Sequence, residues 1–583
     1  MAPRIYVSAV PSVVTYKRSI FTHLFSSTDP TTVGVYPSTF PVFIDAATGT
    51  TLTRGQLKEL ALCFGYGLLR HPKLARQKRG DTLLIFLSNS ITFPVVLFGA
   101  VAAGIKCSPA NTAYVSRELK HQYTDSGAII IATSLEGLPV VQDMFRSLGI
   151  DEEEQVKRIV VIGNGLGWAG GPDSHIEQNR FVRMEELLSL GTLKREEPFD
   201  DLAAHETCYI CYSSGTTGKP KGVETTHANL TTVVDIGRPV TSIYHGQDRL
   251  LGVLPFFHIY GAVALLHVPI MTGSPVIIQT RFDPTQFCAN IEKFKITVAM
   301  VVPPVLVVLA RHPAVDAYNL SSLRVAFSAA APLGNELIMQ VAERFHSKGS
   351  SIAVMQGYGL TETSPITHIL PPSVALQKAG SIGILLPNLE ARIVVDGDGE
   401  GLVDAAEGEP GELWIRGPTI MKGYLNNKNA TVEAITKDGW FKSGDICIRD
   451  KEGFYWIVDR RKELIKYKGF QVPPSELESV LLTHPDIADA AVIGVNNPTE
   501  ATEMPRAYVV HADPTRIRTQ SARDTFSQRV KTWIESKVAS HKFLRGGVVV
   551  IEEIPKSAAG KILRRELRER AKSETAPAAR AKL

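Results

Sequence analysis

The sequence has no stretch of about 18 or more uncharged apolar residues, the length that a membrane-spanning helix needs. Residues 1–21, MAPRIYVSAVPSVVTYKRSIF, also contain no uninterrupted apolar core of the kind found in secretory signals. We therefore expect neither a transmembrane segment nor a secretory signal.

Cysteine is scarce, and neither sign of charge is in excess. The six Cys are scattered without the close, even spacing of a disulfide framework, which indicates a reducing compartment. Cys208 and Cys211 form a C-x-x-C inside an apolar, strand-like run, where their side chains would face opposite sides, and we expect buried structural thiols there rather than redox chemistry. The net charge of +4 is too small to indicate a nucleic-acid partner.

The length and the apolar patterning indicate a globular protein of more than one domain. The 583 residues exceed what one hydrophobic core usually serves, and 44% of them are apolar. Between residues 40 and 200, buried strand-like runs such as Thr82–Leu87 and Ala128–Ala132 alternate with amphipathic helical stretches such as Arg54–Leu69. This alternation predicts a parallel, layered α/β core. Three further helices are expected: one that begins after an N-cap at Asp283, a capped one that opens at Ser475 after Pro473-Pro474, and an amphipathic one at 524–539.

Residues 212–223, YSSGTTGKPKGV, form the most informative stretch. They follow a strand-like run and offer backbone N–H groups, hydroxyls and cations to an anion, which indicates a polyphosphate site. A Walker-type P-loop is excluded, because Ser213 stands where its first Gly belongs and Pro220 where its Mg²⁺-binding hydroxyl belongs. For this stretch alone, a solvated polar turn remains an alternative.

The order SSGTTG-x-PKG resembles the phosphate loop of the adenylate-forming superfamily, which includes the acyl- and aryl-CoA ligases. Further motifs follow in that family's order between about residues 40 and 570. They are PFFHIYG at 255–261, SAAAP at 328–332, QGYGLTE at 356–362, GELWIRG at 411–417, WFKSGD at 440–445, DRRKELIKYKGFQV at 459–472 and PKSAAGK at 555–561. The pattern resembles most the 4-coumarate:CoA ligase branch.

The resemblance implies a role for individual residues. The implied catalytic residues are Lys561 for adenylation, Lys466 for thioester formation and His258 beside the acyl group. The implied ATP- and AMP-binding residues are Ser213, Ser214, Gly215, Thr216, Thr217, Gly218, Lys221, Gln356, Gly357, Tyr358, Thr361, Asp445, Arg460 and Gln471. The implied acyl pocket is formed by Tyr260, Ala264, Ala329, Ala330, Gly357, Pro365 and Ile366. The remaining implied residues are Arg281, Lys468 and Gly469 for CoA, Lys462 for a hinge and Glu362 for Mg²⁺.

The chain departs from the family pattern at three positions. Arg281 replaces a more usual Lys, and Arg is not a simple substitute for Lys. Ala329 replaces a more frequent Gly, which adds a methyl group that could shorten the acyl pocket. Ser443 stands where Thr is usual.

The resemblance implies an α/β protein with a large N-terminal domain of layered α/β sheets (1–458), a small mobile α+β domain (459–571) and a flexible tail (572–583). It implies a ligase that converts a carboxylic acid, ATP and CoA into acyl-CoA, AMP and pyrophosphate through an acyl-adenylate. The acid would be an aryl or phenylpropanoid acid, or a medium-chain fatty acid. Three alternatives stay open: a luciferase-like oxygenase, an enzyme that loads a carrier protein, and a non-catalytic nucleotide-binding protein.

The last three residues, Ala581-Lys582-Leu583, differ by one small side chain from the S-K-L peroxisomal address. They lie on a basic tail that is typical of disordered chain. We therefore expect the import receptor as a partner and the peroxisome as the location, with the cytoplasm as the alternative. Either a monomer or a homodimer is consistent with the sequence.

Overall fold

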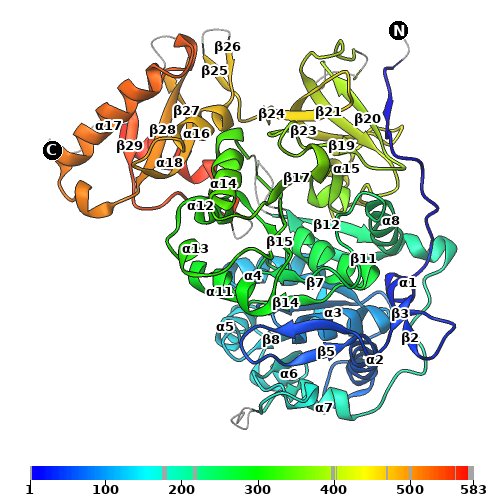
Figure 1. Cartoon of the computed structure of the whole chain (residues 1–583). Helices are drawn as coiled ribbons and strands as arrows, with labels where there is room; N and C mark the ends of the chain where they lie inside the picture. The colour runs from blue at the N-terminus through cyan, green and yellow to red at the C-terminus, as the bar shows by residue number, and fades with distance from the viewer. Residues whose placement is uncertain are drawn as a thin grey trace.

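The computed structural model describes residues 3–173, 180–213, 220–331, 333–395, 401, 403–467, 470–497, 502–557 and 560–575. Two large sheets and a smaller antiparallel sheet lie in the part of the chain up to Arg460, and a smaller unit follows, drawn in orange and red in Figure 1. None of the helices that the structure describes combines the length and the apolar character that crossing a membrane requires.

The first large sheet carries the strand that leads into the Ser/Gly/Thr-rich stretch. Its described strands are, in spatial order, β10 (Val182–Arg183), β9 (Ile159–Ile162), β8 (Ala128–Ser134), β6 (Thr82–Phe86), β7 (Lys106–Pro109), β11 (Thr207–Ser213), β12 (Lys221–Thr226) and β22 (Gly423–Tyr424). Pairing is parallel from β10 to β11 and antiparallel from β11 to β22. The predicted strands at 82–87 and 128–132 are confirmed.

Cys208 and Cys211 lie on β11 and are both buried and free, as expected for structural thiols. Burial raises the pKa of Cys211 to about 12, so its thiol stays protonated and unreactive at physiological pH.

The second large sheet is parallel in its centre. Its described strands are, in order, β19 (Ile384–Leu385), β18 (Ile366–Ile369), β17 (Ala353–Gly359), β16 (Val325–Ser328), β15 (Val298–Val301), β13 (Leu250–Gly252), β14 (Val276–Ile278), β4 (Pro41–Asp45) and β5 (Thr51–Thr53). The strands from β17 to β4 pair in parallel and are almost fully buried, as strands covered on both faces are. The motif residues 328–331 and 356–359 therefore meet at the carboxyl ends of neighbouring strands.

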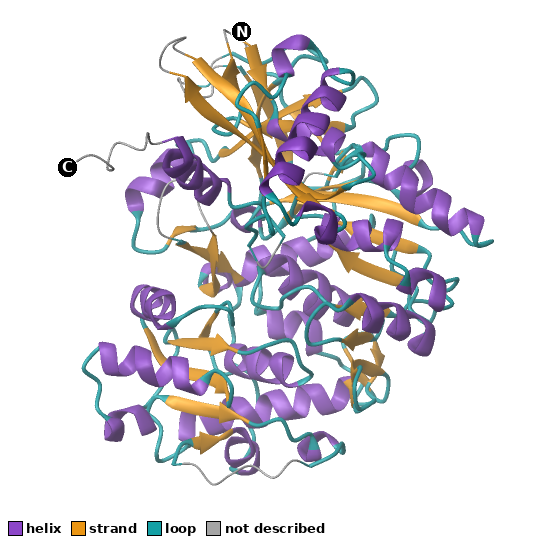
Figure 2. Cartoon of the chain, turned by 90° about the vertical axis from the view of Figure 1, so that its left-hand side faces the viewer, coloured by secondary structure: helices purple, strands orange, loops and turns teal. Residues whose placement is uncertain are grey.

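Helices lie on both sides of these strands, as Figure 2 shows. The helices of the larger part are α1 (Ile20–Phe25), α2 (Arg54–Arg70), α3 (Thr92–Ala102), α4 (Ser116–Ser126), α5 (Leu138–Ser147), α6 (Glu152–Val156), α7 (Met184–Ser189), α8 (His227–Gly237), α9 (Ile259–Gly261), the π-helical η3 (Ala262–His267), α10 (Val268–Thr272), α11 (Pro284–Phe294), α12 (Pro303–Arg311), α13 (Ala314–Ala317), α14 (Asn335–Ser347) and α15 (Lys428–Ala434). Asp283 caps α11 by accepting a hydrogen bond from the Gln286 N–H, as predicted.

The antiparallel sheet carries the motif that ends at Asp445. Its described strands are, in order, β1 (Tyr6–Val7), β20 (Glu390–Val394), β21 (Gly411–Arg416), β23 (Phe441–Arg449) and β24 (Tyr455–Arg460). Pairing of β23 with β24 places Asp445 directly opposite Arg460. The chain leaves this sheet at Arg460 and continues through the turn at 461–464, which contains the expected hinge residue Lys462.

The smaller unit contains β25 (Ile465–Tyr467), β26 (Phe470–Val472), β27 (Ile487–Asn497), β28 (Thr502–His511), β29 (Val548–Val550), α16 (Pro474–Leu481), α17 (Gln520–Glu535) and α18 (Arg564–Thr575). Two details of the sequence analysis were wrong. The helix expected to begin with a cap at Ser475 begins at Pro474, and Asp459 receives the Ser475 N–H instead. The helix expected at 524–539 lies four residues earlier, because Thr519 caps it.

The predicted α/β class, with a large N-terminal part and a small C-terminal one, is confirmed by this architecture. The domain boundaries at residues 458 and 571 stay predictions.

Candidate active site

Adjoining cavities meet at the carboxyl ends of β16 and β17. The central cavity, of about 320 Å³, reaches from Ser213 and Lys221 on β11 and β12 to His258 and Lys561. The interface cavity, of about 200 Å³, lies between the larger part and the smaller unit. Both are lined by Ala330, Gly357, Tyr358, Gly359, Arg460 and Lys561. A position outside the carboxyl ends of parallel strands is a usual place for a ligand in α/β folds.

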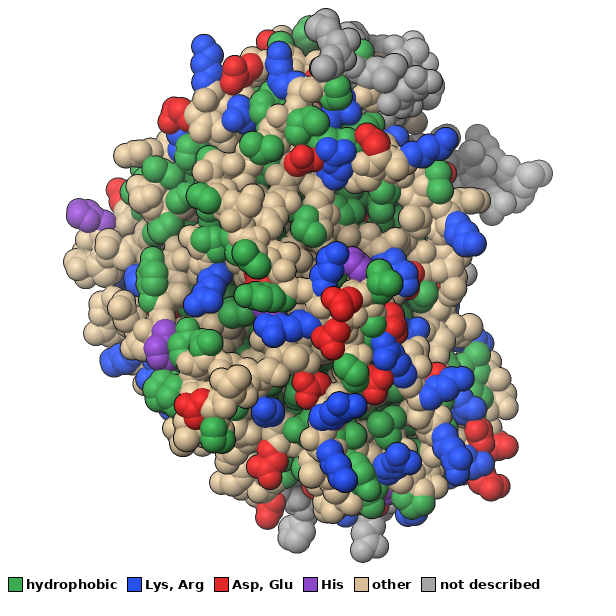
Figure 3. Space-filling view, turned by 90° about the vertical axis from the view of Figure 1, so that its right-hand side faces the viewer, with side chains coloured by type: hydrophobic (Ala, Val, Ile, Leu, Met, Phe, Trp, Pro, Cys, Tyr) green, Lys and Arg blue, Asp and Glu red, His purple; other side chains and the backbone are tan. Residues whose placement is uncertain are grey.

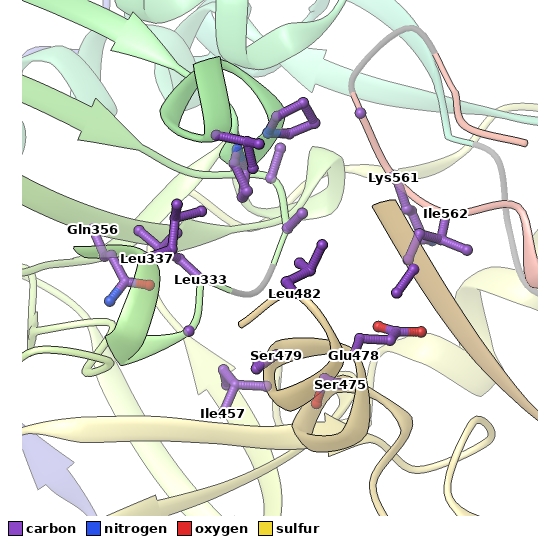
Figure 4. Close-up of a pocket in the computed structure, with 18 of the residues that line it drawn as sticks. Leu333, Leu337, Gln356, Ile457, Ser475, Glu478, Ser479, Leu482, Lys561 and Ile562 are labelled. Atoms are coloured by element: carbon purple, nitrogen blue, oxygen red, sulfur yellow. The ribbon is translucent and has the colours of Figure 1, made fainter. Parts of the chain in front are cut away.

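The interface cavity is enclosed by residues from both parts of the chain. Figure 4 shows Gln356, Leu333 and Leu337 on one side, Ser475, Glu478 and Ser479 of α16 on another, and Lys561 with Ile562 on the C-terminal segment. Arg311 of α12 holds the two parts together, since its guanidinium donates to the carbonyl oxygens of Leu482 and Ile487.

Tyr358, Asp445 and Arg460 form a polar group at the border of the two cavities. The Tyr358 hydroxyl donates to Asp445 Oδ2 at 2.6 Å, and Arg460 Nε lies 3.3 Å from Asp445 Oδ1. Burial and the neighbouring carboxylate raise the pKa of Tyr358, so its hydroxyl stays a donor. A carboxylate has acceptor positions beyond these two, so Asp445 can also receive ribose hydroxyls.

Lys561 projects into both cavities from the segment before α18. Its pKa is lowered to about 8, first by burial and then by the Arg460 cation, while the carboxylates of Glu463, Asp445 and Glu362 act in the opposite direction. A lysine near its titration point, surrounded by both signs of charge, is suited to hold an incoming anion.

A buried ion cluster anchors the helix that follows Lys561. Arg564 Nη1 lies 2.6 Å from Glu463 Oε2, and its Nη2 lies 2.6 Å from Glu478 Oε2. Arg564 Nε also donates to the Val492 carbonyl at 3.2 Å. Because Arg564 is only three residues beyond Lys561, this cluster fixes the base of the segment that carries the lysine. Sequence reasoning missed Arg564, since nothing in its local pattern indicates burial.

His258 is uncharged in this site. Burial and the nearby Lys561 cation lower its pKa to about 4, and its Nδ1 accepts the Tyr260 N–H at 3.2 Å. The Tyr260 hydroxyl donates to the Phe327 carbonyl at 3.2 Å, and this hydrogen bond holds the Tyr260 ring against β16. His258 therefore offers a neutral imidazole to whatever lies in the central cavity.

Glu362 lies in the central cavity with two neighbours that the sequence analysis did not connect to it. Its Oε1 accepts the Tyr424 hydroxyl at 2.8 Å, and the Lys221 ammonium lies 3.9 Å from the centre of the Tyr424 ring. Among the described residues, no group of three or more His, Cys, Asp or Glu is arranged to hold a metal ion. A single carboxylate fits Mg²⁺ only where substrate phosphates supply further oxygens.

An apolar cavity of about 80 Å³ extends from the central cavity and shares Tyr260, Pro365 and Ile366 with it. Of the expected acyl-pocket residues, Ala264 lines the apolar cavity, whereas Ala329, Ala330 and Gly357 line the central one. Sequence reasoning missed most of its walls, which include Val233, Val240, Val263, Met271, Val298, Met300, Phe327, Met355 and Ile369. Only Phe327 and Met355 adjoin recognised motifs, so the sequence offered a signal for these two alone.

Three expected site residues lie elsewhere in this conformation. Lys466 and Lys462 are exposed on the smaller unit, and Arg281 is exposed after β14. None of the three is among the described residues that line these cavities. Ser214, Gly215, Thr216, Thr217, Gly218, Lys468, Gly469 and the side chain of Gln471 lie outside the described residues. Thr361 and Ser213 line the central cavity, and Gln356 lines the interface cavity.

Comparison with solved structures shows where this fold occurs. An anthranilate CoA ligase in complex with anthranoyl-AMP superposes with a TM-score of 0.79 over 97% of this chain and 98% of that one, at 23% identity. An o-succinylbenzoate CoA synthetase from Bacillus subtilis in complex with its acyl-adenylate intermediate gives a TM-score of 0.70 at 27% identity, covering 91% and 95% of the two chains.

Comparison of sequences gives the family. A protein named probable 4-coumarate–CoA ligase 1 from Dictyostelium discoideum is 37% identical over 498 residues, covering 84% of this chain and 86% of its own. A protein named 4-coumarate-CoA ligase 1 from Narcissus pseudonarcissus is 36% identical, covering 92% and 91%. The profile of the AMP-binding enzyme family matches residues 31–425, and that of the AMP-binding enzyme C-terminal domain matches residues 476–561. The resemblance is thereby confirmed: the chain belongs to the AMP-binding, adenylate-forming enzyme family.

Proposed function

We propose that the protein is an ATP-dependent carboxylic acid–CoA ligase that works through an acyl-adenylate. The observation that carries the proposal is the position of Lys561, whose ammonium enters the cavity that also holds Glu362 and His258. The proposal is supported by relatives named 4-coumarate–CoA ligases that are matched over most of their length. The substrate would be an aryl acid, a phenylpropanoid acid or a medium-chain fatty acid.

Adenylation requires an anion to approach a polyanion. Two unit charges about 4 Å apart repel by roughly 4 kcal/mol at an effective dielectric near 20. Lys561, Arg460 and Lys221 all line the central cavity and can offset this repulsion for the acid carboxylate and the phosphates. The carboxylate oxygen then attacks the α-phosphorus, the bond to the bridging oxygen breaks, and pyrophosphate leaves with its electron pair.

The same site requires a different group for the second step, in which the CoA thiol attacks the acyl carbon and AMP leaves. Lys466 is exposed and outside the cavities in this conformation. The proposal therefore includes a rotation of the smaller unit about Lys462, which withdraws Lys561 and presents Lys466. Lys468, Gly469 and Arg281 would contact CoA.

Mg²⁺ is part of the proposal. Glu362 has one oxygen bonded to Tyr424, which leaves the other for a metal ion. When bound with ATP, the ion would neutralise phosphate charge. The chain's contribution is to hold Glu362 in a buried, oriented position.

The rival functions differ in what they consume. ATP–pyrophosphate exchange that depends on added acid separates an adenylating enzyme from a nucleotide-binding protein. Formation of a CoA thioester, detected by product mass, separates a ligase from a luciferase-like or carrier-loading enzyme. Acid-dependent exchange together with thioester is the expected result, and absence of exchange with a broad acid library and Mg²⁺ would refute the proposal.

The peroxisome is proposed as the location, on the residues Ala581-Lys582-Leu583, which lie outside the described residues. A fluorescent fusion at the N-terminus that ends with these three residues is expected to enter peroxisomes. The same fusion without them is expected to stay in the cytoplasm, and identical distributions would contradict a role for the tripeptide.

A further inference from the structure

The side chains that line the apolar cavity offer few hydrogen-bonding partners to a substrate. Among the described residues that line it, none is Asp, Glu, His, Asn or Gln. Tyr260 carries the only aromatic hydroxyl among these described lining residues, and it donates to the Phe327 carbonyl. A substrate group that donates or accepts hydrogen bonds would therefore lose its water at most points along this cavity without finding a partner.

Among the described residues that line the cavity, polar side chains are few, and most come from the segment directly after α8. Arg238, Thr241 and Ser242 follow the last residue of α8, and Arg238 is exposed. Thr272 is the exception, since it ends α10, is 7% exposed and has a hydroxyl without a hydrogen-bond partner among the described residues. Among the described lining residues that lie outside the segment after α8, Thr272 is thus the side chain whose unpartnered hydroxyl could recognise a polar substrate group.

The α8 end of the cavity has room. A Cβ atom built on Gly237 meets no heavy atom within 4 Å, and the exposed Arg238 follows it. The walls are also adaptable, because Met271, Met300 and Met355 contribute flexible thioethers. A tail of variable length can therefore be accommodated, with its end reaching past α8.

We propose that the acid activated by this protein has an apolar tail without hydrogen-bonding groups: a straight-chain alkanoic acid or an unsubstituted phenylalkanoic acid. This inference rests on the proposed ligase function and narrows its substrate class. It excludes the ring-hydroxylated acids suggested by the names of the relatives.

The test uses the unmodified protein and pairs of acids that differ by one hydroxyl, with kcat/KM for CoA-thioester formation as the readout. Suitable pairs are 3-phenylpropanoic with 3-(4-hydroxyphenyl)propanoic acid and cinnamic with 4-coumaric acid. We expect the hydroxylated member to be slower by about tenfold or more, equivalent to ~1.4 kcal/mol. Along an alkanoic series, each added methylene should raise kcat/KM by about fourfold until the tail passes α8.

Equal or faster turnover of the hydroxylated acids would overturn the inference while leaving the ligase function intact. If no acid of any kind yields a thioester, the ligase function itself fails, so the two failures are distinguishable. In Thr272→Val, we expect the ratio of the two kcat/KM values within each pair of acids to stay within about twofold of its value in the unmodified protein. A tenfold change in that ratio would show that Thr272 binds a substrate hydroxyl, which also overturns the inference.

A blocking variant tests which cavity holds the tail. Ala264→Phe places a ring in the apolar cavity, and we expect kcat/KM for octanoic acid to fall by about tenfold or more relative to butanoic acid. Val432→Phe, at a position 74% exposed on α15, is the matched control and should leave the ratio of kcat/KM for octanoic acid to kcat/KM for butanoic acid unchanged. An unchanged ratio in a folded Ala264→Phe variant would place the tail elsewhere and refute the inference.

Discussion

Asp459 Oδ2 accepts two hydrogen bonds from Ser475, one from its backbone N–H at 2.9 Å and one from its hydroxyl at 3.0 Å. Asp459 is the last residue but one of β24 and precedes the proposed hinge at Lys462, whereas Ser475 lies in the first turn of α16 beyond it. The buried carboxylate thus satisfies an N-terminal N–H of a helix in the other part of the chain. This contact belongs to the orientation that places Lys561 in the site.

Ser475→Ala should weaken this orientation. Removing a hydrogen bond to a carboxylate costs about 1.5–3 kcal/mol, a factor of about 10 to 150 in the equilibrium between orientations, so we expect acid-dependent pyrophosphate exchange to fall by about tenfold or more. Thioester formation from a supplied acyl-adenylate should not fall. Ser536→Ala, at an exposed hydroxyl at the end of α17, is the control. Loss of both half-reactions to the same degree would contradict a contact that favours one orientation.

Lys561→Ala should abolish adenylation, because it removes a cation that lines the central cavity together with Arg460 and Glu362. Removing one preorganised electrostatic contact of this type costs about 100-fold or more in rate. Pyrophosphate exchange measures the loss, and thioester formation from supplied acyl-adenylate should be largely retained. If both reactions were lost equally, rotation of the smaller unit would no longer be supported.

Lys466→Ala should have the opposite effect. The exposed Lys466 lines none of the described cavities in this conformation, so pyrophosphate exchange should remain within about twofold of the unmodified protein. Thioester formation should fall, since the proposed second orientation brings this lysine to the site. A variant without exchange activity would remove the role assigned to Lys466.

The pH dependence of pyrophosphate exchange should reflect the titration of Lys561. Its pKa of about 8 means that the ammonium is charged below that pH and loses its proton above it. We therefore expect kcat/KM for ATP to decline above about pH 8, since this parameter reports groups of the free enzyme. Lys561→Arg keeps a positive charge at high pH, so the pH at which kcat/KM for ATP declines should be higher in this variant. An identical decline in that variant would assign it to another group.

Glu362→Gln should raise the Mg²⁺ concentration needed for half-maximal exchange by about tenfold or more, because the ligand charge is lost. Tyr424→Phe should produce a smaller rise, as expected for a residue that orients a ligand. Glu433→Gln on the exposed side of α15 is the control. An unchanged Mg²⁺ requirement in the first variant would exclude Glu362 as the ligand.

Much of the fold could be predicted from local pattern. The strands at Thr82–Phe86 and Ala128–Ser134 and the helix at Arg54–Arg70 were recognised because continuous apolar runs and a helical period are strong signals. The start of α16 was misread, because S-x-x-E at Ser475 reads locally as a capping box although the N–H is taken by Asp459. A partner distant in sequence leaves no local signal.

The candidate site also contains residues that a local motif predicts and residues that no local pattern indicates. The residues around Gln356–Glu362 were predicted from a motif, and the structure places them along the two cavities, while their binding roles stay predictions. Met300 and Val233 come from segments without a motif, and they form a wall only because β15 and α8 converge. Composition could not indicate that this wall excludes hydrogen-bonding groups, since the exclusion depends on which side chains face the same space.

The amino-acid sequence by itself determined which chemical groups this protein carries: a stretch rich in hydroxyls and cations, an acidic residue within the Gln356–Glu362 motif and two lysines on one small unit. Only the tertiary structure decided which lysine enters the site. Lys561 does so because the contacts between Asp459 and Ser475, and between Arg311 and the carbonyls of the smaller unit, set the orientation of that unit. Such contacts join segments far apart in the chain, so their effect exists only after folding.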